Sequence, residues 1–211
     1  MRRSQGPECM RLTLALMSVL VAAIMVTVMS VHAGEARVPD RGLKDLGRGV
    51  EQVKLKDVEG KTVRLKDFGG KPYVLFFGFT RCPVVCPVTV WELDAALEAI
   101  GKDAKDIAIV FITLDPGRDT PAVMKNYFSG FKGRVTALTA PLPVITRMTK
   151  AYDVRFERVD TGKGDYSIDH TAHAFLVNAR GGVVDTVAFG ASRELSVARI
   201  KSLIEADKRR N

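Results

Sequence analysis

The chain has 211 residues, of which 46% are hydrophobic and 27% charged, and it carries a formal net charge of +8 at pH 7. This length and balance suit one folded domain with an appendage, and they exclude a wholly disordered chain. Three cysteines in so long a chain exclude a disulfide-dense scaffold. They leave open a redox pair, a metal site or inert thiols.

An uncharged apolar run occupies residues 12–31, after Arg2, Arg3 and Arg11. A bilayer span takes about 20 residues, whereas the core of a signal peptide takes about 7–15. Because residues 31–33 also resemble a small-residue cleavage site, we expect residues 1–33 to be either an N-terminal transmembrane anchor or a cleaved signal peptide. Positive residues before the run predict that the rest is exported, to the periplasmic face of an inner membrane or an equivalent intermembrane compartment.

Export changes how the charge and the cysteines are interpreted. Without residues 1–33, which contain three arginines and one glutamate, the net charge is +6. The basic residues are scattered, apart from residues 208–210, and form no block with interleaved aromatics, so nucleic acid is not an expected partner. The positive charge favours an ordinary solvated surface over a binding site for a specific acidic partner. Cys9 precedes the apolar run, and therefore only Cys82 and Cys86 reach the exported side.

The rest of the chain shows the patterns of an α/β domain. Polar residues 34–49 predict a linker, and the domain is expected over residues 50–208. We expect strands over residues 53–58, 62–66, 73–79, 107–114, 154–159, 174–177 and 183–189, and helices over residues 88–100, 121–128, 142–152 and 193–208. This order predicts a thioredoxin-like fold, which has a central mixed sheet flanked by helices on both faces, with an N-terminal β-hairpin.

Cys82 and Cys86 lie where a buried strand ends and a helix begins, an edge at which sites gather in open α/β sheets. If the loop makes one turn, both sulfurs face the same side. Helix-start amides and the neighbouring Arg81 favour the thiolate form. The pair can form a disulfide or bind a soft metal. An inert disulfide is less favoured, because closing so short a loop stabilises little.

Two histidines, His170 and His173, remain in the exported part. His173 opens an apolar strand and is expected to be an ordinary strand residue. His170 stands just before that strand, in a loop that would face the cysteine turn in a thioredoxin-like sheet. Two thiolates and one imidazole suit copper, Cu(I) in particular, while Cu(II) is tolerated. Asp169 is either an orienting partner of the imidazole or an ordinary turn carboxylate.

Two features disfavour a plain thioredoxin-type reductase. Dithiol reductases of this fold usually place a cis-proline in the loop opposite the cysteines, but the last proline of this chain is Pro143. Three residues, rather than two, separate Cys82 from Cys86.

Three segments together resemble the SCO/SenC family of copper-binding, thioredoxin-fold proteins over about residues 50–205. They are FGFTRCPVVCP (77–87), LDPGRDTP (114–121) and DYSIDHT (165–171). The resemblance implies that Cys82, Cys86 and His170 bind one copper ion. It also implies a role in assembling the binuclear copper centre of cytochrome c oxidase, by carrying copper or by reducing the target's cysteines. The implied partners are the copper-centre subunit of the oxidase, other copper carriers, and the membrane through the N-terminal segment.

The chain departs from this family pattern beside the cysteines. Arg81 stands where the family usually has histidine, and Val84 stands where it usually has aspartate. Neither position is a ligand in the pattern, so copper binding is expected to survive, while redox potential or partner choice could change.

The segment after the second buried strand carries further charges near the expected site. Asp115, Arg118 and Asp119 are predicted to form a salt-linked loop there, with a structural role.

The leading interpretation is a copper chaperone rather than an enzyme. The alternative is a thiol-disulfide oxidoreductase whose Cys82 and Cys86 cycle through a mixed disulfide, with His170 incidental. A peroxidase that uses Cys82 is less favoured, because no threonine-and-arginine peroxide pocket is apparent around it.

Overall fold

The structure is a computed structural model and describes residues 40–131, 133–162 and 164–209. The predicted anchor or signal and Cys9 lie outside the described residues. Within those residues, no helix combines the length and apolar character needed to cross a membrane.

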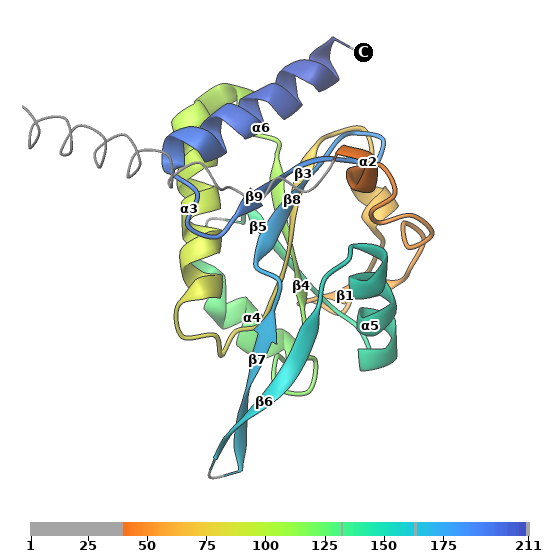
Figure 1. Cartoon of the computed structure of the whole chain (residues 1–211), viewed down its shortest axis with the longest axis vertical. Helices are drawn as coiled ribbons and strands as arrows, with labels where there is room; N and C mark the ends of the chain where they lie inside the picture. The colour runs from red at the N-terminus through yellow and green to blue at the C-terminus, as the bar shows by residue number, and fades with distance from the viewer. Residues whose placement is uncertain (1–39, 132, 163, 210–211) are drawn as a thin grey trace, which may run out of the picture. The chain divides into compact units, whose positions relative to one another are not determined.

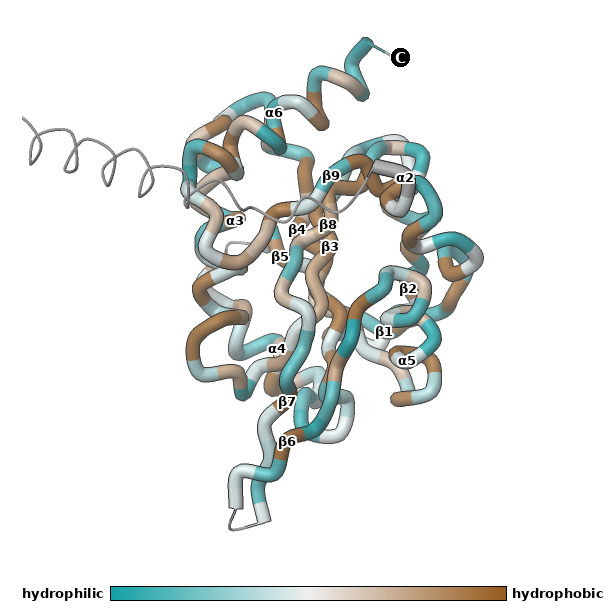
Figure 2. The backbone as a smooth tube through the Cα atoms, viewed as in Figure 1, coloured by the Kyte–Doolittle hydropathy of each residue, from teal (hydrophilic) through white to brown (hydrophobic). Residues whose placement is uncertain are grey.

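A mixed sheet forms the centre of the described chain, with its strands in the order β2-β1-β5-β4-β3-β8-β9 (Figure 1). These strands are β1 (Leu55–Asp57), β2 (Thr62–Val63), β3 (Tyr73–Gly78), β4 (Ala108–Thr113), β5 (Val135–Thr139), β8 (His173–Val177) and β9 (Val183–Ala188). Strand β3 runs parallel to β4 and antiparallel to β8, and all six of its residues are buried. Burial on both faces explains its unbroken apolar sequence. Figure 2 shows the hydrophobic residues concentrated on these central strands.

Helices cover both faces of the sheet, as the sequence predicts. Figure 1 shows α3, α4 and α6 on one side and α2 and α5 on the other. The α-helices are α2 (Asp40–Leu43), α3 (Val85–Ile100), α4 (Pro121–Tyr127), α5 (Leu142–Ala151) and α6 (Arg193–Lys208), and short 3-10 turns cover Leu65–Phe68, Gly101–Ala104 and Ser129–Phe131. Two of the helix starts are set by side-chain caps, because Thr120 accepts from the Val123 amide at 3.3 Å and Ser192 from the Leu195 amide at 3.2 Å. The α/β, thioredoxin-like prediction is confirmed.

A separate two-stranded sheet, β6 (Phe156–Gly162) and β7 (Asp165–His170), extends beyond one end of the central sheet (Figure 1). The sequence predicts a strand at residues 154–159 and a loop before His173. The structure corrects this, because residues 165–170 form an antiparallel strand paired with β6. Strand β5 is also absent from the sequence prediction, since its short, half-polar sequence carries little periodicity.

The predicted linker over residues 34–49 is too long at its C-terminal end. Leu43 is buried, and the Gly47 amide donates to the Ala151 carbonyl at 2.7 Å. Gly47 has a φ of 76°, and a Cβ there would lie 2.6 Å from the Tyr152 ring, so glycine lets the backbone approach the end of α5. The folded body therefore begins before residue 50.

Candidate metal-binding site

The two cysteines lie at the junction of β3 and α3, as predicted. Cys82 is half-buried in the connecting loop, whereas Cys86 is fully buried in the first turn of α3. Both are free thiols. Gly78, at the end of β3, makes room for the second sulfur, because a Cβ there would lie 3.0 Å from Cys86 Sγ and 2.9 Å from the Phe111 ring.

The two sulfurs occupy different electrostatic environments. The Cys86 thiol donates toward the Cys82 sulfur, and the Cys86 amide donates to Cys82 Sγ at 3.3 Å. Together with the Val84 and Val85 amides at the start of α3, these donors lower the pKa of Cys82 to about 5. The pKa of Cys86 is raised, first because its proton is held by Cys82 and then because the thiol is buried. At neutral pH Cys82 is thus a thiolate beside a protonated Cys86.

We expect the alkylation rate of Cys82 by iodoacetamide to rise with a midpoint near pH 5, rather than near the ordinary thiol pKa of 9.0. Only the thiolate reacts, and lowering its pKa keeps it populated until the pH falls through about 5. The measurement uses the reduced chain with Cys9→Ser, so that buried Cys86 is the only other thiol. When Cys86→Ala is added to this variant, the midpoint of Cys82 alkylation should move to higher pH, because the Cys86 thiol is the strongest donor to the Cys82 sulfur. A midpoint at pH 8 or above in the parent would contradict this electrostatic picture.

His170 is the last residue of β7, and its ring lies next to the cysteine pair. Its Nε2 lies 3.4 Å from Cys86 Sγ, and its Nδ1 lies 3.0 Å from the Thr171 carbonyl oxygen. Because a carbonyl only accepts, Nδ1 carries the ring proton and Nε2 presents its lone pair to the sulfur. The rings of Phe76 and Phe79 pack edge-on near the imidazole, with centroids 6.3 and 6.0 Å away. The imidazole is thereby fixed in orientation and tautomer.

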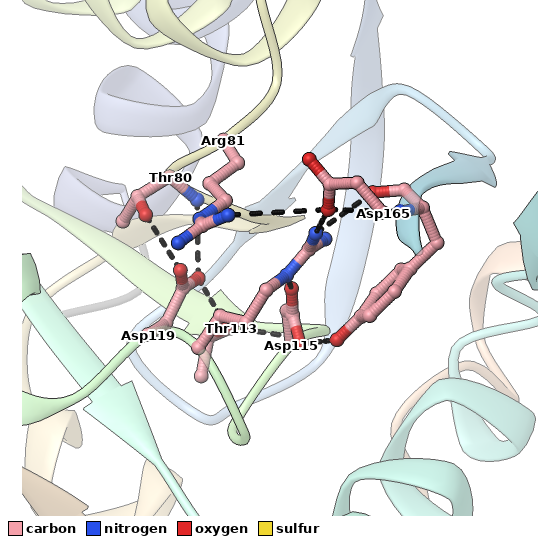
Figure 3. Close-up of polar contacts among 8 residues, drawn as sticks. Thr80, Arg81, Thr113, Asp115, Asp119 and Asp165 are labelled. Atoms are coloured by element: carbon pink, nitrogen blue, oxygen red, sulfur yellow. Dashed lines mark hydrogen bonds and ion pairs between the residues drawn. The ribbon is translucent and has the colours of Figure 1, made fainter. Parts of the chain in front are cut away.

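The other candidate residues lie around this centre. Asp169 is exposed, and the acceptor at His170 Nδ1 is the Thr171 carbonyl, which therefore orients the imidazole in its place. His173 opens β8, as the sequence predicts. Arg81 is exposed, and its guanidinium lies 3.9 Å from the Asp165 carboxylate (Figure 3). The site opens on an exposed pocket lined by Arg155, Phe156, Glu157, Asp169, His170 and Thr171.

The contacts among Cys82, Cys86 and His170 are pairwise. In the part of the chain that the structure describes, no three His, Cys, Asp or Glu side chains are grouped so that they could hold a metal ion as they stand. The chemistry of the donors nevertheless suits a soft ion, because Cys86 contacts both the second sulfur and an imidazole nitrogen.

The loop between β4 and α4 contains the predicted ion pair, but one member behaves differently. The Arg118 guanidinium pairs with the buried Asp115 carboxylate. Asp119 is not part of this pair. Its buried carboxylate accepts from the hydroxyls of Thr80 and Thr113, both at 2.6 Å, as Figure 3 shows. Sequence reasoning missed both threonines, and a hydroxyl on a strand end carries no pattern that predicts such a partner.

Comparisons with known proteins agree with this fold. The SCO1/SenC family model matches residues 45–205. The solved structure of ScoI from Bradyrhizobium japonicum with copper bound is 39% identical, and the match covers 71% of this chain and 96% of that one, with a TM-score of 0.65. Yeast Sco1 with copper bound is 30% identical, covering 72% of this chain and 86% of that one, with a TM-score of 0.67. The mitochondrial protein SCO1 of Saccharomyces cerevisiae is 32% identical over 163 residues, which are 74% of this chain and 55% of that protein. The chain belongs to the SCO1/SenC family.

Proposed function

We propose that this chain binds one copper ion through Cys82, Cys86 and His170 and delivers it to the binuclear copper centre of cytochrome c oxidase. The observation that carries the proposal is the 3.4 Å contact between Cys86 Sγ and His170 Nε2, which joins side chains 84 residues apart. Its support from relatives is that the matched ScoI and Sco1 structures hold copper.

The donors favour Cu(I) for physical reasons. Thiolates are soft ligands, and the imidazole lone pair adds a ligand that suits copper. The Cys86 thiol has a single proton, and both the Cys82 sulfur and His170 Nε2 lie beside it as acceptors. A Cu(I) ion that replaced this proton would bind the two sulfurs and the imidazole nitrogen. Because the ion and the proton both carry a charge of +1, the net charge of the site would not change. Closing the set around one ion calls for a small shift, which the half-buried loop at Cys82 can supply.

Transfer also fits the exposure of the site. His170 borders an exposed pocket and Cys82 is half-buried, so an incoming ligand can approach before the old ligands leave. Loading requires Cys86 to release its proton, and below about pH 5 the Cys82 thiolate is protonated as well. The affinity for copper should therefore fall at acid pH.

His170→Ala tests the three-ligand site. Zinc-finger sites bind Zn²⁺ with roughly 10–16 kcal/mol over four ligands, or about 3 kcal/mol for each. With a contribution of that size from the imidazole, the affinity for Cu(I) should fall about a hundredfold or more. The measurement is competition with a chelator, and thermal unfolding of the metal-free chain checks that the fold is intact. His173→Ala is the matched control and should bind as the parent does. Parent-like binding by His170→Ala would contradict the proposal.

A second candidate function is thiol-disulfide exchange, and the asymmetry of the two sulfurs favours it. A thiolate at Cys82 can attack a disulfide of a target, and the buried Cys86 can then resolve the mixed disulfide. The readout is reduction of an oxidised copper-centre peptide with two cysteines. If His170→Ala reduces it at the parent rate while losing copper, the two activities are separable. If only the parent reduces it, the exchange depends on the complete site.

The N-terminal residues support a proposal for the place of action. We propose that the chain acts on the exported side of a membrane, held by residues 12–31 or released by cleavage after residue 33, next to the membrane-bound oxidase. The mass of the mature N-terminus distinguishes an anchor from a cleaved signal. Arg81 and Val84, which replace the histidine and aspartate usual in the family, add a positive and an apolar side chain at this surface and are candidates for setting partner choice.

A further inference from the structure

The loop between β4 and α4 contacts both of the segments that carry the proposed ligands. We propose that residues 115–119 act as a bracket that fixes the distance between the cysteine pair and His170. Asp119 positions the cysteine half of the site, and Arg118 positions the histidine half. The inference rests on the proposed function for its meaning, but the contacts that carry it are independent of any metal.

Asp119 holds the cysteine half. Its carboxylate is 1% exposed and accepts from the Thr80 amide at 3.1 Å as well as from the Thr80 hydroxyl at 2.6 Å. A third bond, from the Thr113 hydroxyl at 2.6 Å, ties the same carboxylate to the end of β4. Thr80 stands two residues before Cys82, so this one side chain links the start of the cysteine loop to the central sheet (Figure 3).

Arg118 holds the histidine half. Its guanidinium donates to the Asp165 carboxylate and to the Tyr166 carbonyl, both at 2.8 Å, and lies 3.5 Å over the Tyr166 ring. The Tyr166 hydroxyl in turn donates to Asp115 at 2.8 Å. Tyr166 and His170 lie on the same face of β7, because successive side chains alternate along a strand. The arginine therefore fixes the beginning of the strand whose last residue is His170.

The Asp119 contacts, which form the cysteine arm of the bracket, and the Arg118 contacts, which form its histidine arm, start from one turn. The amides of Arg118 and Asp119 both donate to the Asp115 carbonyl, at 3.1 and 2.8 Å. The Asp115 side chain is fully buried and pairs with Arg118. Arg118 and Asp119 are adjacent in this turn, yet Asp119 contacts the cysteine loop and Arg118 contacts the strand that carries His170. The turn therefore helps to set the distance between the cysteine loop and that strand. The His170 end of β7 is tied to β3 through β8, which begins at His173 and pairs with β3 in the central sheet. The beginning of β7 lies outside that sheet, and Arg118 holds it by the contacts described above.

The test separates the two arms with metal-free readouts on the whole reduced chain. Arg118→Gln should speed amide hydrogen exchange in β7 by about tenfold and leave the Cys82 alkylation rate unchanged. Asp119→Asn should change the alkylation rate by about threefold or more and leave exchange in β7 unchanged. Arg118→Lys should behave like Arg118→Gln, because an ammonium cannot reproduce the planar fork. Arg134→Gln, which removes the ion pair with Asp94 elsewhere in the fold, is the control and should change neither readout.

Copper then provides a second measurement. Arg118→Gln should lower the affinity for Cu(I) toward that of His170→Ala. If the metal-free readouts split as stated while the parent binds no copper, the bracket stands and the proposed function fails. If each variant changes both readouts together, or neither variant changes any, the bracket is overturned. Should Arg118→Gln not fold, Tyr166→Phe removes only the hydroxyl bond to Asp115, and unchanged exchange in β7 would then overturn the histidine arm.

Discussion

Cys86→Ser is expected to abolish retention of Cu(I) by the chain in the presence of a competing chelator. Cys86 is the central donor, because it contacts both the Cys82 sulfur and His170 Nε2. A serine hydroxyl is a hard ligand that does not ionise near neutral pH, so the affinity should fall by about a thousandfold or more, beyond the effect of losing one typical ligand. Bound metal is measured after equilibration with the chelator and dialysis, at about one copper per chain in the parent.

The chain offers a matched control for this experiment. Cys9→Ser also removes one of the three cysteines, but Cys9 precedes the apolar run and is not a proposed ligand. It should leave copper retention unchanged. If Cys86→Ser and Cys9→Ser retain the same amount as the parent, the sulfur ligands have been assigned wrongly.

Asp115→Ala is expected to destabilise the fold by about 3–5 kcal/mol, the usual effect of breaking a buried ion pair from one side. Asp115 is fully buried, neutralises the Arg118 guanidinium and accepts the Tyr166 hydroxyl at 2.8 Å. Among the described residues, Nη2 of Arg118 already has no hydrogen-bond partner, so losing the carboxylate would strand more of a buried charge. At about 2–4 °C for each kcal/mol, the melting temperature should fall by about 10 °C.

Asp165→Ala provides the comparison, because it removes the other carboxylate that bonds the same arginine. The Asp165 side chain is 60% exposed, and solvent screens such pairs, so the free energy of unfolding should change by no more than about 1 kcal/mol. Both variants are compared by thermal and urea unfolding of the metal-free chain. Equal losses for the two would show that burial does not decide the strength of this pair.

Local sequence patterns predict most of the fold. The unbroken apolar sequence of β3 predicts its burial, and the start of α6 at Arg193 follows from its serine cap. The cysteine turn is equally readable, because a strand end, two cysteines and a helix start follow one another in the chain. These features depend on neighbours in sequence, and such neighbours are visible without a structure.

The features that escaped prediction depend on distant contacts. Strand β7 is half-polar, because its hairpin has only a small inward face formed by residues such as Tyr166 and Ile168. Asp169 was one of two alternatives, an orienting partner or a turn carboxylate, and the acceptor at His170 Nδ1 is a backbone carbonyl instead, which no sequence pattern reveals. Asp119 was expected in a salt link but accepts from hydroxyls 6 and 39 residues away. Each result required knowing which strands end side by side.

The position of the β6–β7 hairpin has a consequence for association between chains. A two-stranded ribbon clear of the main sheet leaves the outer backbone groups of its strands open, and such edges invite pairing with another chain. Exposed charges of both signs lie along β6, at Glu157, Arg158 and Asp160. Burying them against a second ribbon would cost desolvation energy, which disfavours edge-to-edge aggregation. The hairpin that bears the imidazole is therefore protected along its β6 edge against pairing with other chains.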